Sequence, residues 1–572
     1  MKHYSRSVWL HHIFILLLAW AGTVQACPTC HPQLAQHTQE FEKRIYKVTD
    51  GVWVAVGYGI ANSIMIEGND GVIIVDVMES VEAAQDVKKD FDKIVPNKPV
   101  KAIIYTHNHA DHCFGATAFA GDDNPLVISH ATTIKEFANI LNVIQPIIYQ
   151  RAMRQFGNFL GDGDQVNDGI GLHFNFDGER PIGLILPNHT FSGESTTLQI
   201  AGVKMELVHA PGETDDQIFV WLPEKKVLLP GDNFYKAFPN LYAIRGTSKR
   251  DTVGWVASLD KMRARQPEFL VPSHTRPIKG RDEIMTRLTN YRDAIQFVHD
   301  QTVFYMNLGL SPSDIVERVK LPQHLAEDPY LQEYYGKVEW SIRSIFTSYL
   351  GWYSGEARDL YPVGNMERAQ SMAKLVGGPD ALARQAKSAL ASGNPRWALQ
   401  LADDAVRLKP ESKFALEIKV AALEKLAEGE ISANGRNYLL TMAREAQGKI
   451  SIPHVDRRSE GIGIAHVMPL HLVFDAMKIK LDKDKSADVT VSVNFSFTDT
   501  EEEYSIQVRK GVAEIQARTT DTAQWNLRCN SMRWKEVLAG FCSAGDLLKD
   551  GDVEFDGQET DLGAVLHLFS PA

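Results

Sequence analysis

Short apolar runs separated by turn residues dominate the first part of the chain, and this pattern predicts β-strands. Residues 52–56, 63–66 and 72–76 are divided by Gly-rich breaks, as strands that pair with one another are. Residues 80–94 then show apolar positions at helical spacing, with Ser80 in the N-cap position. Residues 100–105 are short, apolar and rich in β-branched side chains, which indicates a buried strand. Strand, helix and strand in this order describe one half of a layered sandwich.

Three later apolar runs also end in polar residues. Residues 204–209, 227–229 and 269–271 read as strands, and each is followed within a few positions by a carboxylate or a histidine. In α/β folds the carboxyl ends of strands are where sites form. We therefore expect these strand ends to lie together and to carry the chemistry.

Helical periodicity replaces the strand pattern after about residue 282. We predict helices over residues 285–307, 311–319, 341–350, 381–391, 395–408 and 413–427. The last three resemble a tetratricopeptide-type hairpin, with Trp397, Ala398, Ala402 and Ala405 on its packing face. A layer of this kind is too short for a solenoid and is expected to serve as a dimer surface.

The pattern changes again from about residue 464. Residues 489–497, 504–509 and 512–517 alternate apolar and polar positions like a meander, followed by a helix over 534–541 and a short strand over 552–555. This small sheet with helices resembles the sterol-carrier-like fold. The expected boundaries are therefore residues 1–26 for a signal peptide, 40–281 for a catalytic domain, 282–446 for a helical dimerisation domain and 460–572 for a C-terminal domain.

Four potential metal ligands follow the buried strand at residues 100–105 within a few positions. His107, His109, Asp111 and His112 offer three imidazoles and a carboxylate, the ligands that zinc takes in catalytic sites. They are too close in sequence for one metal to accept all four, so we expect two metals, with His107 and His109 on one and Asp111 and His112 on the other. A run H-x-H-x-D-H after a buried strand resembles the metallo-β-lactamase superfamily.

That resemblance implies an αββα sandwich and supplies the remaining ligands. Glu213 stands where the superfamily usually has a histidine, although Asp215 and Asp216 nearby are alternatives. Asp232 matches the carboxylate that bridges both metals, and His274 the last ligand of the second metal. The expected metal set is His107, His109, Asp111, His112, Glu213, Asp232 and His274. Three other histidines, His130, His189 and His209, are interpreted as structural.

The order of three domains narrows the resemblance to the zinc-dependent alkyl sulfatases. Residues 240–246 (Asn-Leu-Tyr-Ala-Ile-Arg-Gly), residues 334–336 (Tyr-Tyr-Gly) and residues 349–352 (Tyr-Leu-Gly-Trp) carry it, together with the metal run. The family implies that Arg245 contacts the sulfate; the alternative is an Arg245 that pairs with Asp251 at the surface. We assign catalytic roles to Asp111, Arg245 and Tyr242, and substrate contacts to Arg245, Asn240 and Tyr242. Pro239 replaces a family histidine proposed to assist the leaving group, so the leaving-group acid stays open.

The resemblance implies an α+β multidomain sulfuric-ester hydrolase. We expect a binuclear zinc site whose activated hydroxide hydrolyses an alkyl or aryl sulfate ester with an apolar tail, in a homodimer. Two other functions stay open: a hydrolase of the same fold that acts on a lactam, thioester or phosphoester, and a non-catalytic lipid-binding scaffold.

Composition and the N-terminus add limits to this reading. The 572 residues suffice for about three or four domains, and the net charge of −12 argues against nucleic acid as a partner. Lys2 and Arg6, the apolar residues 13–21 and the small-residue pattern ending at Ala26 indicate an export signal, hence a periplasmic or secreted protein with no transmembrane segment after cleavage. Cleavage there would expose Cys27, so a lipoprotein anchor is the alternative. An oxidising compartment permits disulfides Cys27–Cys30 and Cys529–Cys542, leaving Cys113 unpaired.

Overall fold

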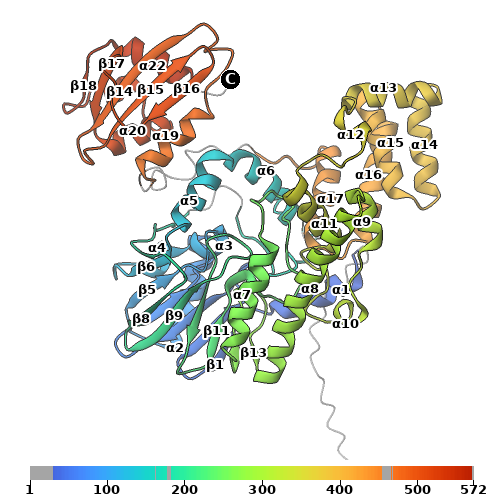
Figure 1. The fold of residues 1–572 in the computed structure, drawn as a ribbon, viewed down its shortest axis with the longest axis horizontal. Helices are drawn as coiled ribbons and strands as arrows, with labels where there is room; N and C mark the ends of the chain where they lie inside the picture. The colour runs from blue at the N-terminus through green and yellow to red at the C-terminus, as the bar shows by residue number, and fades with distance from the viewer. Residues whose placement is uncertain (1–29, 162, 177–181, 454–465, 467, 570–572) are drawn as a thin grey trace, which may run out of the picture.

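A computed structural model describes residues 30–161, 163–176, 182–453, 466 and 468–569 (Figure 1). The expected signal peptide and Cys27 lie outside these residues. Within them the chain forms a two-sheet sandwich, a bundle of helices and a separate small sheet with its own helices. No helix in this part of the chain is long and apolar enough to cross a membrane.

The first sheet of the sandwich has seven strands in sequence order, β1-β2-β3-β4-β5-β6-β7. The predicted strands are present, and the run that leads into the metal ligands is β5, paired in parallel with β4 and β6. The strands are β1 (Arg44–Thr49), β2 (Val52–Val56), β3 (Ser63–Glu67), β4 (Val72–Val75), β5 (Val100–Ile104), β6 (Leu126–His130) and β7 (His189–Phe191).

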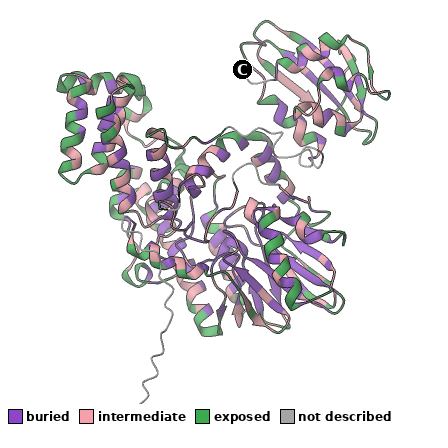
Figure 2. Ribbon diagram, turned by 180° about the vertical axis from the view of Figure 1, so that it is seen from behind, coloured by how far each residue is buried: buried purple, intermediate pink, exposed green. Residues whose placement is uncertain are grey.

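The second sheet has six strands in the order β13-β12-β11-β10-β9-β8 and packs against the first. A buried apolar layer that includes Ile73, Ile104, Leu207 and Leu229 joins the two sheets, and it is the purple interior in Figure 2. The strands are β8 (Ser195–Ile200), β9 (Val203–His209), β10 (Ile218–Leu222), β11 (Val227–Leu229), β12 (Phe269–Leu270) and β13 (Ile278–Lys279).

Helices cover the outer face of each sheet, which confirms the predicted αββα order. On the first sheet Ser80 caps α2, its hydroxyl accepting a hydrogen bond from the Ala83 amide at 3.2 Å. On the second sheet α7 and the long α8 share one core with the strands. The covering helices are α2 (Val81–Ile94), α3 (Ala110–Cys113), α4 (Ala116–Ala120), α7 (Thr252–Ala264) and α8 (Arg281–Asn307). The N-terminal α1 (Pro32–His37) and η1 (Thr38–Phe41) precede the first strand.

The long connection between β6 and β7 is helical, and these helices were not predicted from the sequence pattern. Between β6 and β7 the chain forms α5 (Thr133–Ala138), a π-helical turn η2 (Asn139–Val143) and α6 (Gln145–Phe156). π-turns are rare and are found mostly at functional sites. In Figure 1 these helices lie above the end of the sandwich, on the side of the predicted ligands.

The helical region beyond α8 contains the predicted hairpin. Ala398, Ala402 and Ala405 are buried as expected, but Trp397 is 41% exposed, so its placement on the packing face was wrong. Trp397 lies in the first turn of its helix, where its backbone amide donates to the side chain of the N-cap residue Asn394. The helices are α9 (Pro312–Arg318), α10 (Gln323–Ala326), α11 (Val338–Leu350), α12 (Ala357–Leu360), α13 (Asn365–Val376), α14 (Pro379–Ala391), α15 (Pro395–Leu408), α16 (Lys413–Glu428) and α17 (Ala433–Ala446).

The C-terminal unit is a five-stranded sheet in the order β16-β15-β14-β17-β18, with helices packed on it. Its interior is filled by stacked aromatic rings, among them Phe474, Phe495 and Trp534. Cys529 and Cys542 are free thiols, so the expected disulfide between them is absent: Cys529 is packed into the core, whereas the Cys542 thiol faces the carbonyl of Arg533. The elements are α19 (Leu470–Lys478), β14 (Thr490–Phe497), β15 (Glu503–Arg509), β16 (Val512–Gln516), β17 (Trp525–Cys529), α20 (Ser531–Leu538), α21 (Ala544–Leu547), β18 (Glu554–Phe555) and α22 (Glu559–His567).

Candidate metal and substrate site

Seven side chains of metal-binding type converge where strands of both sheets end. They form three overlapping groups whose ligand atoms lie within 4.8 Å of one another. Asp232 belongs to two of the groups, and so does His112. The residues are the seven predicted ones: His107, His109, Asp111, His112, Glu213, Asp232 and His274.

The local structure at each strand end aims these side chains inward. His107 follows β5, and the short α3 begins at Ala110, so that Asp111 and His112 lie in its first turn. Asp232 lies in the 3-10 turn η3 (Gly231–Asn233) directly after β11. A Cβ on Gly231 would lie 2.0 Å from the side-chain nitrogen of Gln217, and its φ is +60°, so only glycine fits this turn.

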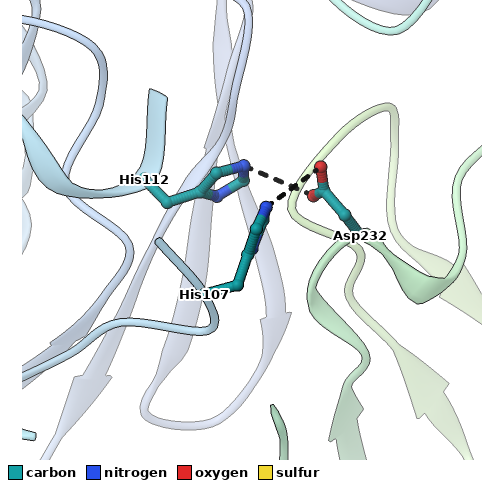
Figure 3. A group of neighbouring side chains, drawn as sticks. All are labelled: His107, His112 and Asp232. Carbon is teal, nitrogen blue, oxygen red and sulfur yellow. Dashed lines mark ion pairs between the residues drawn. The ribbon is translucent and has the colours of Figure 1, made fainter. Parts of the chain in front are cut away.

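The ligand atoms lie close enough to one another to hold metal together. Nε2 of His107 lies 2.8 Å from Nδ1 of His109, and Nε2 of His112 lies 3.3 Å from a carboxylate oxygen of Asp111. Asp232 lies between His112 and His107 (Figure 3). Its Oδ1 is 3.4 Å from Nε2 of His112, and its Oδ2 is 3.8 Å from Nε2 of His107. The second of these oxygens is also 3.1 Å from Nε2 of His274.

Protonation states of several of these groups suit metal binding, which requires neutral imidazoles and ionised carboxylates. Burial, assisted by the charge of His112, lowers the pKa of His107 to about 3. For Asp111 burial alone would raise the pKa, but the charges of His112 and His274 lower it to about 2. Burial would lower the pKa of His112, yet the carboxylates of Asp232 and Asp111 raise it. The carboxylates thus draw a cation to the place where a metal would stand.

Unpaired buried atoms support the same fit. Nε2 of His112 and Oδ1 of Asp232 are both buried, have no hydrogen-bond partner and face each other. Buried polar atoms without partners are rare in folded proteins, so each requires an explanation. A metal ion between the two supplies it.

The opposite ring nitrogen of each of three histidines is held by a fixed partner. Nδ1 of His112 lies 2.8 Å from Asp76, and Nδ1 of His274 lies 2.8 Å from the carbonyl oxygen of Ile60. The Thr106 hydroxyl lies 3.1 Å from Nδ1 of His107. Such contacts orient the ring and leave Nε2 for a metal.

Asp76 is the centre of this support. Its carboxylate accepts hydrogen bonds from the Thr106 amide at 2.9 Å and from the Ser273 hydroxyl at 2.7 Å. Thr106 follows a strand of the first sheet and Ser273 follows a strand of the second. Asp76 has a φ of +58°, in the left-handed region, a strained conformation of the kind found at functional sites.

A cavity of about 190 Å³ opens beside the ligands. One end is polar and contains His109, Asp111, Glu213 and Asp232. The rest is apolar and is formed by α5, η2, α6 and residues 170–176. Its apolar lining includes Phe114, Phe137, Ile140, Leu141, Ile144, Ile148, Tyr149, Met153, Phe156, Ile170, Phe174 and Phe176.

Two arginines stand at the polar end. Arg245 donates from Nη2 to Nε2 of His109 at 3.3 Å, and its Nη1 is buried without a partner. Asp251, the alternative partner of Arg245, instead caps α7 by accepting from the Val253 amide, so that alternative is wrong. Arg250 forms an ion pair with Glu213 at 2.6 Å and keeps two buried nitrogens unpaired.

Sequence analysis assigned no role to Arg250 or Tyr335. Arg250 lies four positions after the family run and is 4% exposed, but a lone Arg in a polar loop carries no distinguishing signal. Tyr335 belongs to the Tyr-Tyr-Gly segment and lines the cavity. Burial raises the pKa of its phenol, which therefore stays protonated.

Other predicted residues occupy less direct positions. Asn240 is fully buried, and its backbone carbonyl accepts a hydrogen bond from Arg250. Neither Asn240 nor Tyr242 is among the described residues that line the cavity. Asp216 is also fully buried but outside the ligand groups, whereas Asp215 lines the cavity. His130 and His209 stack on each other with ring centres 3.8 Å apart, away from the ligands.

Family models match three parts of the chain. A metallo-beta-lactamase superfamily model matches residues 56–274, an alkyl sulfatase dimerisation model residues 311–449, and an alkyl sulfatase C-terminal model residues 460–572. The predicted fold class and the predicted order of units are confirmed by these matches.

Whole-chain relatives agree with the models. A linear primary-alkylsulfatase of Pseudomonas sp. (strain ATCC 19151) is 36% identical over 523 residues, which is 88% of this chain and 98% of that protein. An (R)-specific secondary-alkylsulfatase of Pseudomonas sp. is 27% identical, covering 92% of this chain and 81% of that one. The solved structure of the stereoselective inverting sec-alkylsulfatase Pisa1 from Pseudomonas sp. superposes with a TM-score of 0.90 at 26% identity, over 95% of this chain and 87% of that chain.

Proposed function

The chain belongs to the alkyl sulfatase family of the metallo-β-lactamase superfamily, and from that premise we propose that it hydrolyses alkyl, or aryl, sulfate esters to an alcohol and sulfate. One observation carries the proposal. Four of the seven convergent ligands and two guanidinium groups line one end of a cavity whose other walls are largely apolar. A sulfate ester has a matching shape, with a small anionic head on an apolar tail.

We assign two zinc ions to the seven ligands. The donor atoms favour His107, His109 and Glu213 for one ion, and Asp111, His112 and His274 for the other, with Asp232 shared. Bound zinc supplies a hydroxide near neutral pH and polarises the bound ester. Asp111 acts in this scheme as a ligand, and Asp76 and Thr106 hold the rings in place.

Arg245 is assigned to the sulfate head because of how it meets His109. Nδ1 of His109 faces His107, so we take Nδ1 as the ligand atom. A metal on Nδ1 leaves the ring proton on Nε2, which faces Nη2 of Arg245. Two N–H donors then point at each other, and a sulfate oxygen between them satisfies both.

Arg250 and Asn240 complete the anionic end in this proposal. The two unpaired nitrogens of Arg250 give the sulfate a second cation. Asn240 acts indirectly, because its backbone carbonyl holds the Arg250 guanidinium. Tyr335 lines the same cavity with a protonated phenol, so we assign it, rather than Tyr242, as an O–H donor to the ester oxygen that becomes the alcohol.

The apolar tail is placed in the cavity under α5, η2 and α6. Its wall is formed by aliphatic and aromatic side chains, which stabilise a bound chain by about 0.8 kcal/mol per buried methylene. The C-terminal unit is a weaker candidate for the tail because stacked aromatic rings fill its interior. That unit instead meets the cavity roof, since α19 packs against η2.

We also propose that the chain forms a homodimer through its helical region. Its proposed location is periplasmic or secreted. The match of a dimerisation model to residues 311–449 supports the dimer, and large apolar side chains such as Trp352 (72% exposed) and Tyr361 (84% exposed) are available to an interface. Sedimentation velocity at micromolar concentration should give the mass of two chains. A stable monomer there would refute the dimer.

The decisive experiment is a substrate panel on the zinc-loaded protein. We expect turnover of hexyl and dodecyl sulfate with release of inorganic sulfate, and at least about 100-fold lower kcat/KM on nitrocefin, a thioester and a phosphodiester, which lack the matched head group. Turnover of the lactam or thioester with no sulfate release would identify a different hydrolase of the same fold. No turnover at all in protein with full zinc content would favour the lipid-binding scaffold.

A further inference from the structure

Glu79 is a buried carboxyl group to which the proposed reaction gives no role. It lies between β4 and α2, one residue before the helix cap, and is fully buried. Burial, with the nearby charge of Asp111, raises the pKa of Glu79 to about 7. A residue whose ionisation is this unfavourable needs a structural reason to be where it is.

The first contact of Glu79 is with the turn before β3. A Cβ on Gly59 would lie 2.3 Å from one carboxyl oxygen of Glu79 and 2.4 Å from the other, so the carboxyl group rests directly on the Gly59 backbone. The backbone amide of the next residue, Ile60, faces the same carboxyl group and limits the rise of its pKa, while Oε2 of Glu79 is buried without a hydrogen-bond partner. The carbonyl oxygen of Ile60 in turn accepts from Nδ1 of His274 at 2.8 Å. Glu79 therefore packs against the turn whose Ile60 carbonyl group orients a metal ligand.

The second contact is with the wall of the cavity. The Asn175 amide donates to Oε1 of Glu79 at 3.1 Å. Asn175 stands between Phe174 and Phe176, whose side chains line the apolar part of the cavity. Phe174 also packs on Phe156, with ring centres 4.8 Å apart. The place of this aromatic wall thus depends on the same carboxyl group.

A neighbouring carboxyl group holds the wall through a different set of hydrogen bonds. Asp168 accepts from the Phe174 amide at 2.7 Å and from the side-chain amide of Asn437 at 3.1 Å. Asp168 is also fully buried. Two consecutive amides, those of Phe174 and Asn175, are therefore fixed by two different carboxyl groups, and Glu79 is the one that also reaches His274 through Ile60.

We propose that Glu79 is a positioning residue that joins the metal ligand His274 to the aromatic wall, so that zinc retention and the preference for alkyl chain length depend on one side chain. The part that concerns chain length rests on the proposed function. No bond forms or breaks at Glu79. Its effect is geometric, through the Ile60 peptide on one side and the Asn175 amide on the other.

The test compares Glu79→Gln, Glu79→Ala and Asp168→Asn with the zinc-loaded parent. Two quantities are measured: the apparent zinc Kd by competition with a chelator, and the ratio of kcat/KM for dodecyl sulfate to that for hexyl sulfate. Support for an oriented ligand is worth about 10- to 100-fold in metal affinity, so we expect at least about a tenfold weaker zinc Kd in Glu79→Ala. We expect the chain-length ratio to fall by about fivefold or more, and Glu79→Gln, which keeps one acceptor oxygen, to lie between.

Asp168→Asn separates the effect on chain length from the effect on zinc binding. It should change the chain-length ratio while its zinc Kd stays within about twofold of the parent, because the Asp168 carboxyl group accepts from the Phe174 amide and from Asn437 rather than from the Gly59–Ile60 turn. Asp404→Asn is the matched control: Asp404 is 1% exposed and pairs with Arg368 in the helical region, so neither quantity should change. Thermal unfolding of each variant checks folding, and Glu79→Gln serves if Glu79→Ala does not fold.

The outcomes are distinguishable from failure of the proposed function. If the parent releases no sulfate, the proposed function fails, and the zinc measurement still tests the link to His274. If the parent is active but both Glu79 variants keep its zinc Kd and its chain-length ratio within about twofold, the inference is overturned. A change in only one of the two quantities in Glu79→Ala overturns it as well, because the joint dependence is what is proposed.

Discussion

The two ends of the cavity are built in different ways. At the metal end each side chain follows a strand of a sheet, and second contacts such as Asp76 with His112 fix its orientation. At the apolar end the wall is made of helices and a loop, and Ile144 in this wall is 41% exposed. The metal end is held by hydrogen bonds and ion pairs among its polar side chains, whereas the apolar end relies mainly on packing, with hydrogen bonds from the Phe174 and Asn175 amides to buried carboxyl groups.

This difference predicts how each end responds to change. Removing a ligand or its partner leaves a buried charge or polar atom without compensation, which costs far more than its share of the contact area. Removing a methylene or a ring from the wall costs in proportion to the area lost. Loss at the metal end should therefore be nearly complete and independent of substrate length, and loss at the apolar end should be graded and length-dependent.

The largest effect is expected for His109→Ala. Loss of this imidazole removes one ligand and opens the place where Arg245 and the ring meet, so zinc content should fall and kcat/KM on every sulfate ester should drop by more than about 1,000-fold. Metal analysis and sulfate release measure the two quantities. His189→Ala, an exposed histidine outside the ligand groups, is the control. Full activity in metal-free protein would contradict the assignment.

Arg245 should show the next largest effect. Arg245→Ala loses charge-assisted contacts in a dry site, about 2 to 4 kcal/mol, or roughly 30- to 1,000-fold in kcat/KM. Arg245→Lys keeps the charge but loses the fork, so it should lie between. Zinc content should not change, and hexyl and dodecyl sulfate should lose equally. An Arg245→Ala enzyme as fast as the parent would remove the arginine from the sulfate site.

Asp76→Asn tests support rather than ligation. Because Asp76 orients His112 without reaching the metal, we expect the apparent zinc Kd to weaken by about 10- to 100-fold. Much of the activity should return when zinc is in excess, which distinguishes this variant from His109→Ala. Chelator competition and activity at two zinc concentrations give the answer. A variant with unchanged zinc Kd would show that Asp76 is not needed for ligand geometry.

Phe174→Ala should have the smallest effect and the most selective one. Loss of a ring from the wall costs about 2 kcal/mol of contact with a long tail, so KM for dodecyl sulfate should rise about tenfold or more. Hexyl sulfate should change by less than about threefold, and zinc content not at all. KM and kcat measured over a series of chain lengths test this. Equal losses at all lengths would mean that the tail lies elsewhere.

The sequence predicted the metal end better than the apolar end for a physical reason. Ligands must be His, Asp or Glu and must follow strands, so His107 to His112 could be read directly from residue type and position, whereas Asp232 was assigned from the family resemblance. The apolar wall can be made from any large apolar residues, and α5, η2 and α6 carry no signal that separates a cavity roof from an ordinary packed helix. Arg250 and Glu79 were missed because their roles depend on contacts between segments far apart in the chain, Glu213 for one and Asn175 for the other.

Helix boundaries could be foreseen from the sequence, whereas pairings between distant residues could not. The ends of helices such as α2 and α15 were placed within a residue because their caps and periodicity are local. Cys529 and Cys542 could be matched by spacing, but the two thiols face different surroundings, which no local pattern shows.

Asp76 has an entropic consequence as well. Its carboxylate is held by Thr106 on one sheet and by Ser273 on the other while it orients Nδ1 of His112. Fixing a side chain in one rotamer costs conformational entropy, and here that loss occurs when the sandwich folds. A ligand ring that is already oriented would not lose that freedom a second time when an ion binds.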